Sequence, residues 1–481
     1  PSFLITRSNS ISQIHQELLQ ASITCEQMVH SYLANIENLK HLNAFVEVYA
    51  DEAIQAAKAL DIKIKQNPTA LGRLFGCFIS VKDLIVQKGH KVTAGSKILE
   101  GFVSQFDATC IAALLAEDAI IIGRTNCDEF GMGSANTNSY YGPVKNGANM
   151  DRVSGGSSGG AAVSVQMDMC LAAIGTDTGG SVRQPASMCG VYGFKPSYGM
   201  VSRYGLVAYA SSFDQAGIIA KNIDDIIKIM EVISILDEYD ATMMTQDLFP
   251  SQNNALPETI KIAYFIETIE NDALDPEIKA ATKKELENLK NSGAIVEAVS
   301  FDLLEALVPC YYILTTAEAS SNLSRYDGVR YGYRSPDAKT LSDMYVKSRT
   351  EGFGTEVKKR IMLGTYVLSE AYYDAYFTKA QQVRRLICER MDAIFAEYDF
   401  IIMPTTPKVA WPIHESAKDP LESYMADIYT VLANLAGIPA ISVPIDNNNE
   451  KMPFGIQVMG NRKDEKKLLK FAERLQAKTY I

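Results

Sequence analysis

Two serine–glycine clusters hold the residue types best suited to covalent chemistry in this chain. Gly155–Gly160 reads Gly-Gly-Ser-Ser-Gly-Gly and Gly175–Ser181 reads Gly-Thr-Asp-Thr-Gly-Gly-Ser, so that Ser181 follows Ser157 by 24 positions. Serines with glycine neighbours are accessible and lie beside backbone N–H groups that no side chain covers. Such a hydroxyl can attack a carbonyl carbon, and N–H groups in a tight turn can hold the resulting oxyanion, at about 3–4 kcal/mol per donor. The clusters therefore indicate a nucleophile beside an oxyanion hole.

Lys82 is the candidate base, because it ends the apolar run Ile79-Ser80-Val81. A lysine amine has an ordinary pKa of about 10.4, and burial would lower it and free the lone pair to accept a proton. Each segment also has a plainer interpretation. A lysine after an apolar run is more often a surface residue, a glycine turn often simply ends in serine, and a glycine–serine run is often a linker. Only the three segments together favour catalysis.

Histidine is not the predicted base. None of the five histidines lies in the serine–glycine region; they are His15, His30, His41, His90 and His414. A Ser-His-Asp triad is defined by geometry and not by sequence order, so the sequence leaves it as an alternative. We favour the arrangement of two serines and a lysine.

The composition is that of an ordinary globular protein with an acidic balance. The 481 residues are 47% hydrophobic and 21% charged, with a net charge of −11. This acidity argues against a nucleic-acid-binding surface, because phosphate binding needs a basic patch. Eight cysteines without a CxxC pair indicate a reducing compartment, so we expect a cytoplasmic protein without a metal site. Pro1–Leu4 lacks a signal-peptide pattern, and no apolar run of about 18 residues predicts a membrane span.

Short apolar runs predict the sheet that must position these residues. Four of them precede helix-like or glycine-rich stretches: Phe78–Val81, Ala119–Ile122, Cys170–Ile174 and Val191–Phe194. Such alternation is expected of an α/β sheet with helices on its faces. The preceding chain is predicted to be helical, with capping boxes at Ser10–Gln13 and Thr24–Gln27 and a helix over 51–65.

The sheet pattern is interrupted and then returns. Asp275-Pro276 predicts a helix start between strands over Ile260–Phe265 and Ala294–Val299. Residues 303–395 are predicted to be mostly helical. Later strands are predicted at Phe400–Met403, Ala440–Pro444 and Phe454–Met459. Because the chain leaves the sheet and comes back to it, we predict one elaborated domain.

Taken together, the motifs resemble the amidase signature family. The first glycine–serine cluster, the spacing to Ser181 and Lys82-Asp83 carry the resemblance. It implies an α/β/α sandwich with a large central mixed sheet covered by helices on both faces. The implied domain is single and spans 1–481, with the signature core at about 72–220 and a largely helical elaboration at about 303–395.

The resemblance also implies a role for each catalytic candidate. Ser181 matches the nucleophile and Lys82 matches the base. Ser157 matches a bridging serine that relays the proton, and the peptide bond before it is cis in the family. These three residues would make a Ser–cis-Ser–Lys triad.

The resemblance also implies roles for the residues around Ser181. The backbone N–H groups of Thr178, Gly179 and Gly180, with that of the nucleophile itself, would form the oxyanion hole. Asp177 and Arg183 match a family pair that braces the turn, which is a structural role.

Further motifs are similar to the glutamine-hydrolysing branch of the family. They extend over nearly the whole chain: Asn126–Ser134, Gln184–Ala186, Lys195–Gly199, Val201–Ala208, Ala319–Gly328 and Arg360–Gly364. Members of this branch hydrolyse glutamine and pass ammonia to a partner B subunit, which uses ATP and Mg to amidate Glu-tRNA(Gln) or Asp-tRNA(Asn). A small C subunit completes the heterotrimer. The acidity of the chain fits this division, because tRNA binding falls to the partner.

Glutamine carries an α-ammonium and an α-carboxylate, so a selective pocket needs a carboxylate and a guanidinium. The resemblance aligns Arg360 and Asp427 with the pair that binds these groups, and Tyr311 with a tyrosine that lines the same pocket. From the pattern alone, Arg360 fits a solvated helix face equally well, and Asp427 fits a helix surface.

Three functions remain after the sequence is read. The first is the glutaminase subunit of a tRNA-dependent amidotransferase. The second is a stand-alone amidase that acts on another carboxamide, which Arg360 and Asp427 argue against. The third is a non-catalytic scaffold with a decayed site, which the intact Ser181, Ser157 and Lys82 argue against.

Overall fold

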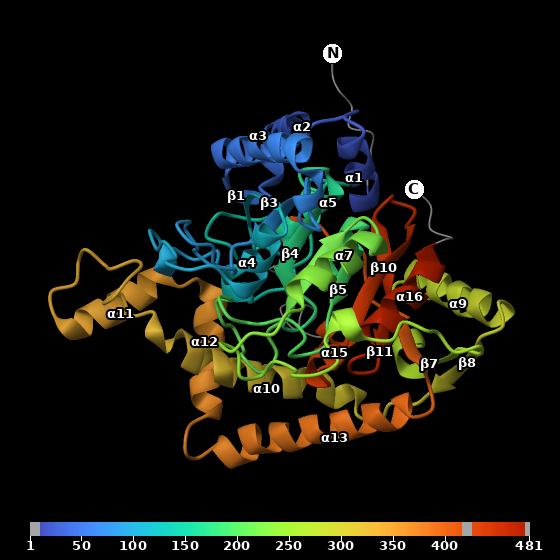
Figure 1. Cartoon of the computed structure of the whole chain (residues 1–481). Helices are drawn as coiled ribbons and strands as arrows, with labels where there is room; N and C mark the ends of the chain where they lie inside the picture. Colours follow the sequence, from blue (N-terminus) through green and yellow to red (C-terminus); the bar gives the residue numbers. More distant parts are fainter. Residues whose placement is uncertain (1–9, 416–425, 477–481) are drawn as a thin grey trace.

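One mixed β-sheet runs through the computed structural model, which describes residues 10–415 and 426–476. In these residues eleven strands take the order β1-β3-β2-β4-β6-β5-β10-β11-β9-β7-β8 (Figure 1). Strands β3, β2 and β4 are parallel, as are β9, β7 and β8, and the pairs between these groups are antiparallel. The strands are β1 (Phe45–Val48), β2 (Phe78–Lys82), β3 (Ile120–Thr125), β4 (Ala172–Thr176), β5 (Tyr192–Lys195), β6 (Ala216–Ala220), β7 (Lys261–Phe265), β8 (Ile295–Val299), β9 (Phe400–Pro404), β10 (Ala440–Asn447) and β11 (Pro453–Gly460).

Two groups of helices flank the central strands. Helices α5 and α6 contact each other and pack on the sheet, and α7 contacts both α4 and α16. The predicted α/β sandwich is therefore confirmed. The helices are α1 (Ile11–Leu19), α2 (Cys25–Asn38), α3 (Ala50–Gln66), α4 (Thr109–Ala116), α5 (Gly159–Gln166), α6 (Arg183–Cys189), α7 (Ile223–Ile233), α8 (Ile266–Ile269), α9 (Pro276–Asn291), α10 (Leu304–Asn322), α11 (Leu341–Gly352), α12 (Thr355–Val367), α13 (Lys379–Phe395), α15 (Val431–Leu435) and α16 (Glu465–Gln476).

Helices α1, α2 and α9 begin at the capping residues that the sequence predicts. Both capping boxes form, because the side chains of Ser10 and Thr24 accept hydrogen bonds from N–H groups in the first turns of α1 and α2. Asp275 caps α9 by accepting from the N–H of Glu277 at 2.8 Å, with Pro276 at the first helical position. Each cap satisfies an N–H group that has no partner within the helix.

Two strands are not predicted by the sequence. Strand β6 reads Ala-Gly-Ile-Ile-Ala and lies between β4 and β5. Alanine and glycine have low strand propensity, so the run does not read as a strand. Gly217 is nevertheless required there, because a Cβ would lie 2.7 Å from the carbonyl oxygen of Phe194. The other missed strand, β1, is four residues long and pairs at the sheet edge.

Residues 303–395, predicted to be mostly helical, contain helices α10 to α13. Figure 1 shows α13 along the bottom of the molecule and α11 on a projection at the left. Helix α10 packs against α12, α13 and α15, and α15 follows directly on a segment of the active site described below. The elaboration therefore supplies one wall of that site.

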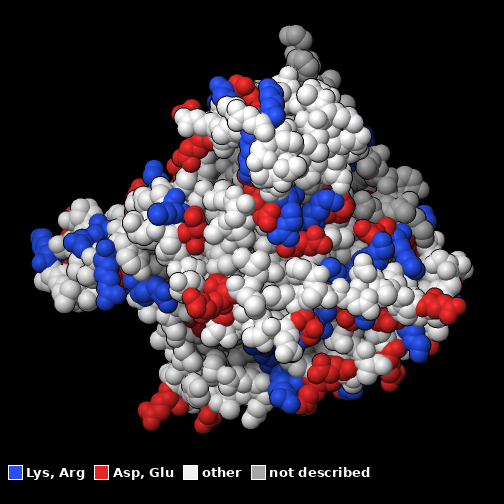
Figure 2. All heavy atoms as spheres, in the orientation of Figure 1, with Lys and Arg blue, Asp and Glu red and all other residues white. Residues whose placement is uncertain are grey.

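The visible surface carries both signs of charge. Figure 2 shows acidic and basic side chains interspersed over the body of the molecule, with basic side chains gathered on the projection that carries α11. Within residues 10–415 and 426–476, no helix combines the length and hydrophobicity that a membrane crossing needs.

Gly160 gives a test of how tightly the first glycine cluster packs. A Cβ at this position would lie 2.4 Å from the carbonyl oxygen of Ala44 and 2.5 Å from that of Asn126. Since backbone atoms cannot move aside, we expect Gly160→Ala to lower the free energy of unfolding by about 3 kcal/mol. The midpoint of thermal unfolding measures this loss.

Gly89→Ala is the matched control. Gly89 has a φ of +78° but no atom within 4 Å of a built Cβ, so the change adds backbone strain of about 1–2 kcal/mol without a clash. An equal or smaller loss for Gly160→Ala would contradict the packing argument.

Candidate active site

Lys82 lies at the end of a fully buried central strand. All five residues of β2 are buried, and the strand pairs with β3 on one side and β4 on the other. The Lys82 side chain is consequently 0% exposed. The interpretation of Lys82 as a surface lysine is wrong, because neighbouring strands enclose its whole stem.

Three hydroxyl groups surround the Lys82 amine. Its Nζ lies 2.8 Å from the Oγ of Ser157, 2.8 Å from the Oγ of Ser158 and 2.8 Å from the Oγ1 of Thr176. Burial lowers the pKa of Lys82 to about 8, although nearby acidic groups act in the opposite direction. A substantial fraction of the amine is therefore neutral slightly above neutral pH and can accept a proton.

The acceptors near each hydroxyl indicate which serine can exchange a proton with Lys82. Ser158 donates to the carbonyl oxygen of Thr176 at 3.1 Å, so it can only accept from the amine. Among the described residues, the Ser157 hydroxyl has no acceptor other than Lys82. Ser157 is thus the serine whose proton can pass to the lysine lone pair.

The first glycine cluster is a packed turn and not a linker. Every residue of Gly155–Gly160 is buried, and the peptide bond between Gly156 and Ser157 is cis, as the family resemblance implies. A Cβ on Gly156 would lie 2.2 Å from Oδ2 of Asp128, so only glycine fits. The N–H of Ser158 donates to the carbonyl oxygen of Ser181 at 3.1 Å, which holds the two clusters together.

Ser181 stands on a turn braced by a buried ion pair. The guanidinium of Arg183 contacts the carboxylate of Asp177 at 2.9 Å, and both side chains are 0% exposed. The same carboxylate accepts from the N–H groups of Gly180 at 2.9 Å and Val182 at 3.1 Å. Burial alone would raise the pKa of Asp177, but Arg183 outweighs it and holds that pKa well below its usual range.

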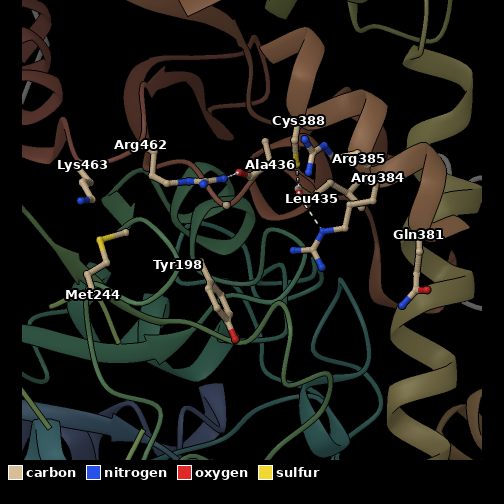
Figure 3. A pocket seen from close by; sticks show the side chains of 11 residues that line it. Tyr198, Met244, Gln381, Arg384, Arg385, Cys388, Leu435, Ala436, Arg462 and Lys463 are labelled. Carbon is tan, nitrogen blue, oxygen red and sulfur yellow. Dashed lines mark hydrogen bonds between the residues drawn. The ribbon is translucent and has the colours of Figure 1, made fainter. Parts of the chain in front are cut away.

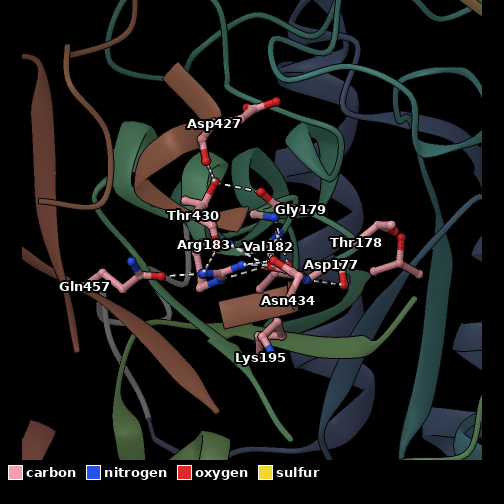
Figure 4. A network of polar contacts seen from close by, with 12 residues as sticks. Asp177, Thr178, Gly179, Val182, Arg183, Lys195, Asp427, Thr430, Asn434 and Gln457 are labelled. Atoms are coloured by element: carbon pink, nitrogen blue, oxygen red, sulfur yellow. Dashed lines mark hydrogen bonds and ion pairs between the residues drawn. The ribbon is translucent and has the colours of Figure 1, made fainter. Parts of the chain in front are cut away.

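Arg183 also ties the turn to the C-terminal part of the chain (Figure 4). It donates to the carbonyl oxygen of Thr430 at 3.0 Å, to Oδ1 of Asn434 at 2.7 Å and to Oε1 of Gln457. The Oγ1 of Thr430 donates in turn to the carbonyl oxygen of Gly179 at 2.6 Å. One guanidinium therefore fixes strand β11, the segment before α15 and the turn that carries Ser181.

One of the predicted oxyanion-hole donors, the N–H of Gly180, has another acceptor in the structure. In the peptide between Gly179 and Gly180, the carbonyl oxygen accepts from the Oγ1 of Thr430 and the N–H donates to Asp177, so the Gly180 N–H is already engaged. Within the described residues, the N–H groups of Thr178, Gly179 and Ser181 have no acceptor. These three remain the predicted donors.

The predicted glutamine-binding residues meet at one small cavity with Ser181. Arg360, Asp427 and Tyr311 line it together with Gly179 and Ser181. Arg360 comes from α12 and Tyr311 from α10, while Asp427 opens the short turn before α15. All three are buried, so the interpretations of Arg360 as a solvated helix face and of Asp427 as a helix-surface residue are wrong.

Comparison with known proteins agrees with this geometry. A family model described as Amidase matches residues 27–469. The chain belongs to the amidase family. A protein of Chlorobaculum tepidum, named as the A subunit of glutamyl-tRNA(Gln) amidotransferase, is 48% identical over 473 residues, which cover 96% of each chain. One of the same name from Fusobacterium nucleatum is 46% identical over 477 residues, covering 97% of this chain and 96% of the relative.

Solved structures show the same amidase fold. The crystal structure of the A subunit of glutamyl-tRNA(Gln) amidotransferase from Thermotoga maritima has a TM-score of 0.79 and 36% identity, and covers 98% of this chain and 96% of its own. A crystal structure of an amidase has a TM-score of 0.84 at 26% identity, with 98% of this chain and all of that chain covered.

Sequence reasoning missed Glu356, Tyr209 and Tyr312, which contact the charged residues of this cavity. Arg360 donates from Nε to Glu356 at 2.8 Å and from a terminal nitrogen to the hydroxyl of Tyr209 at 2.8 Å, and the hydroxyl of Tyr312 donates to Asp427 at 2.5 Å. The spacing of Glu356 four positions before Arg360 was a usable signal, since residues four apart lie side by side on a helix. The two tyrosines gave none, because only the fold brings them to the site.

Arg360 and Asp427 both keep their charges at neutral pH although they are buried. Burial raises the pKa of Asp427 to about 6, while Tyr312 and Arg360 act to lower it. Burial opposes the charge of Arg360, but the surrounding tyrosine hydroxyls and Glu356 raise its pKa well above the ordinary value. At neutral pH the cavity therefore presents a cation and an anion.

Ser181→Ala tests the nucleophile. Without the hydroxyl no acyl-enzyme can form, so we expect glutamine hydrolysis to fall by at least about a thousandfold. Release of glutamate measures the activity, and the thermal unfolding midpoint checks that the variant is folded. Turnover near the wild-type rate in a folded variant would remove Ser181 from the mechanism.

The pKa of Lys82 predicts how the rate depends on pH. The base acts when it is neutral, so kcat/KM for glutamine should rise with pH through about 8, by about 25-fold from pH 6.5 to 8.5. Lys82→Arg keeps the charge but cannot lose its proton in this range, and should be inactive at every pH tested. A flat profile, or an active arginine variant, would contradict the lysine base.

Proposed function

We propose that this chain is the glutamine-hydrolysing A subunit of a tRNA-dependent amidotransferase. It hydrolyses glutamine to glutamate and ammonia, and the ammonia passes to a partner subunit. The observation that carries the proposal is the cavity beside Ser181, where buried Arg360 and Asp427 provide opposite charges for a free α-amino acid. The names of the full-length relatives from Chlorobaculum tepidum and Fusobacterium nucleatum support the same function.

The chemistry begins with proton transfer along the triad. Neutral Lys82 takes the proton of Ser157, which takes that of Ser181, and the Ser181 oxygen attacks the side-chain amide carbon of glutamine. The oxygen of the amide becomes an oxyanion that the N–H groups of the nucleophile turn hold. The C–N bond then breaks, and the leaving nitrogen receives a proton back through Ser157 to leave as ammonia.

Water completes the cycle. The same relay takes a proton from water, whose oxygen attacks the acyl carbon of the ester on Ser181. The bond between that carbon and the serine oxygen breaks, and the oxygen regains its proton as glutamate leaves. Because every proton moves through Ser157 and Lys82, the mechanism uses no histidine.

Two charged contacts position glutamine for this attack. Arg360 binds the α-carboxylate and Asp427 the α-ammonium, with Tyr311 along the side of the substrate. Tyr311 approaches the nucleophile turn closely, since a Cβ on Gly179 would lie 2.4 Å from its hydroxyl. The pocket thus holds the α-groups at one end and presents the side-chain amide to Ser181 at the other.

The proposal includes partners that receive the ammonia. A B subunit would amidate Glu-tRNA(Gln), or Asp-tRNA(Asn), with ATP and Mg bound in that subunit, and a small C subunit would complete a cytoplasmic heterotrimer. The net charge of −11 on this chain supports leaving tRNA binding to the partner, because phosphate contacts require a basic surface.

Arg360→Ala and Asp427→Ala separate glutamine binding from amidation. Each removes a charge-assisted contact worth about 1.5–3 kcal/mol, so kcat/KM for glutamine should fall by about 10- to 150-fold. Ammonia bypasses the glutaminase step, so ammonia-dependent amidation of Glu-tRNA(Gln) by the assembled complex should stay at the wild-type rate. Paired kinetics with the two nitrogen sources measure both effects.

Each outcome has a distinct meaning. Equal losses with glutamine and ammonia would indicate a damaged fold or subunit interface and would overturn the pocket assignment. Efficient hydrolysis of a simple amide without α-groups by the wild type, unaffected by either change, would favour a stand-alone amidase instead.

A further inference from the structure

A second cavity lies away from the catalytic serine. It has a volume of about 540 Å³, within the range of small-molecule sites, and shares no residue with the cavity beside Ser181. Its wall comes from α13, the end of α15, the segments that follow β5 and β11, and the stretch between α7 and β7 that carries Met244 (Figure 3).

Four cationic side chains line this second cavity. They are Arg384, Arg385, Arg462 and Lys463, and among the described residues no carboxylate joins them in the lining. Arg385 pairs with Glu389 at 2.7 Å and Lys463 with Asp247 at 3.3 Å, and both acids lie outside the lining. In a chain with a net charge of −11, such a concentration of one sign is unusual and favours an anion.

Arg384 and Arg462 have no ion-pair partner in the described residues. Arg384 donates to the carbonyl oxygens of Leu435 at 3.0 Å and Ser212 at 3.2 Å, and its guanidinium lies over the ring of Phe213 at 4.2 Å. Burial lowers its pKa, which means that the unpaired charge is poorly solvated. An anion would restore the lost solvation.

Arg462 approaches the same backbone from another element. It donates to the carbonyl oxygen of Ala436 at 2.7 Å. Figure 3 shows Arg462 and Arg384 reaching toward Ala436 and Leu435 from two sides of the cavity. A guanidinium has five N–H donors. Arg384 uses two of them on the carbonyl oxygens of Leu435 and Ser212, and Arg462 uses one on that of Ala436. These contacts with backbone carbonyls at the end of α15 and at Ser212 thus leave most N–H donors of both arginines for a ligand.

The remaining wall suits an organic group. Tyr198, Met244, Leu435 and Ala436 give it an aromatic ring and apolar surface. We propose that this cavity binds the phosphate group of a small molecule between Arg384 and Arg462, with any organic part against Tyr198 and Met244. Phosphate is favoured over carboxylate because it carries more charge and more acceptor oxygens, and arginine forks match it in pairs.

AMP, inorganic phosphate and acetate are the probes that test the proposal, with binding to the full chain followed by calorimetry. We expect saturable binding of AMP or phosphate and none of acetate. Tighter binding of AMP assigns a phosphorylated organic molecule, and equal affinity assigns free phosphate. The double variant Arg462→Gln/Lys463→Gln removes two charges from the cavity lining and should weaken binding at least about tenfold.

Arg390→Gln is the matched control. Arg390 stands on α13 like Arg384, but it pairs with Asp302 at 2.7 Å and lies outside the lining. Its affinity for the probes should equal that of the wild type. The proposal is overturned if neither phosphate compound binds, if acetate binds as tightly, or if the double variant and the control bind alike. Weaker assembly with partner subunits in the double variant, without phosphate binding by the wild type, would assign the cavity to an acidic protein segment instead.

Discussion

The buried ion pair of Asp177 and Arg183 is the interaction on which the rest of the site depends. Two charges without solvent are stable only when hydrogen bonds satisfy them on every side, and here backbone N–H groups, Thr430, Asn434 and Gln457 do so. Removal of one partner from such a pair costs about 3–5 kcal/mol, because the other charge is left uncompensated. The position of Ser181 and the start of α15 are therefore not independent features of the fold.

Burial at the site shifts the pKa values of Lys82 and Asp427 in opposite directions. It moves the pKa of Lys82 down to about 8, toward the neutral form that a base requires. It moves the pKa of Asp427 up to about 6, which still leaves a carboxylate at neutral pH. One physical cause, the exclusion of water, thus favours the neutral form of the predicted base and opposes the charge of Asp427, which its contacts with Tyr312 and Arg360 help to retain.

The sequence predicts the parts of this structure that local rules determine. Caps, short apolar strands and glycine clusters are local, and the caps of α1, α2 and α9 as well as the strands that lead to Lys82 and Ser181 follow from them. Strand β6 could not be predicted, because Gly217, which lowers its strand propensity, is required by the close approach of the Phe194 carbonyl. Tyr209 and Tyr312 were missed for a related reason: each reaches the site through a contact between residues far apart in sequence. The direction of the Gly180 N–H is likewise set by Asp177 and Thr430 and not by the glycine motif itself.

The partners of Arg183 have a consequence for how the protein is made. Thr430, Asn434 and Gln457 follow Arg183 by 247, 251 and 274 positions, so the ribosome adds the predicted triad residues long before it adds the brace of the turn that carries Ser181. A nascent chain, or a fragment that stops before Thr430, carries Lys82, Ser157 and Ser181 on a turn whose guanidinium lacks these three contacts. The turn that carries Ser181 is therefore fully braced only after Gln457 has been added to the chain.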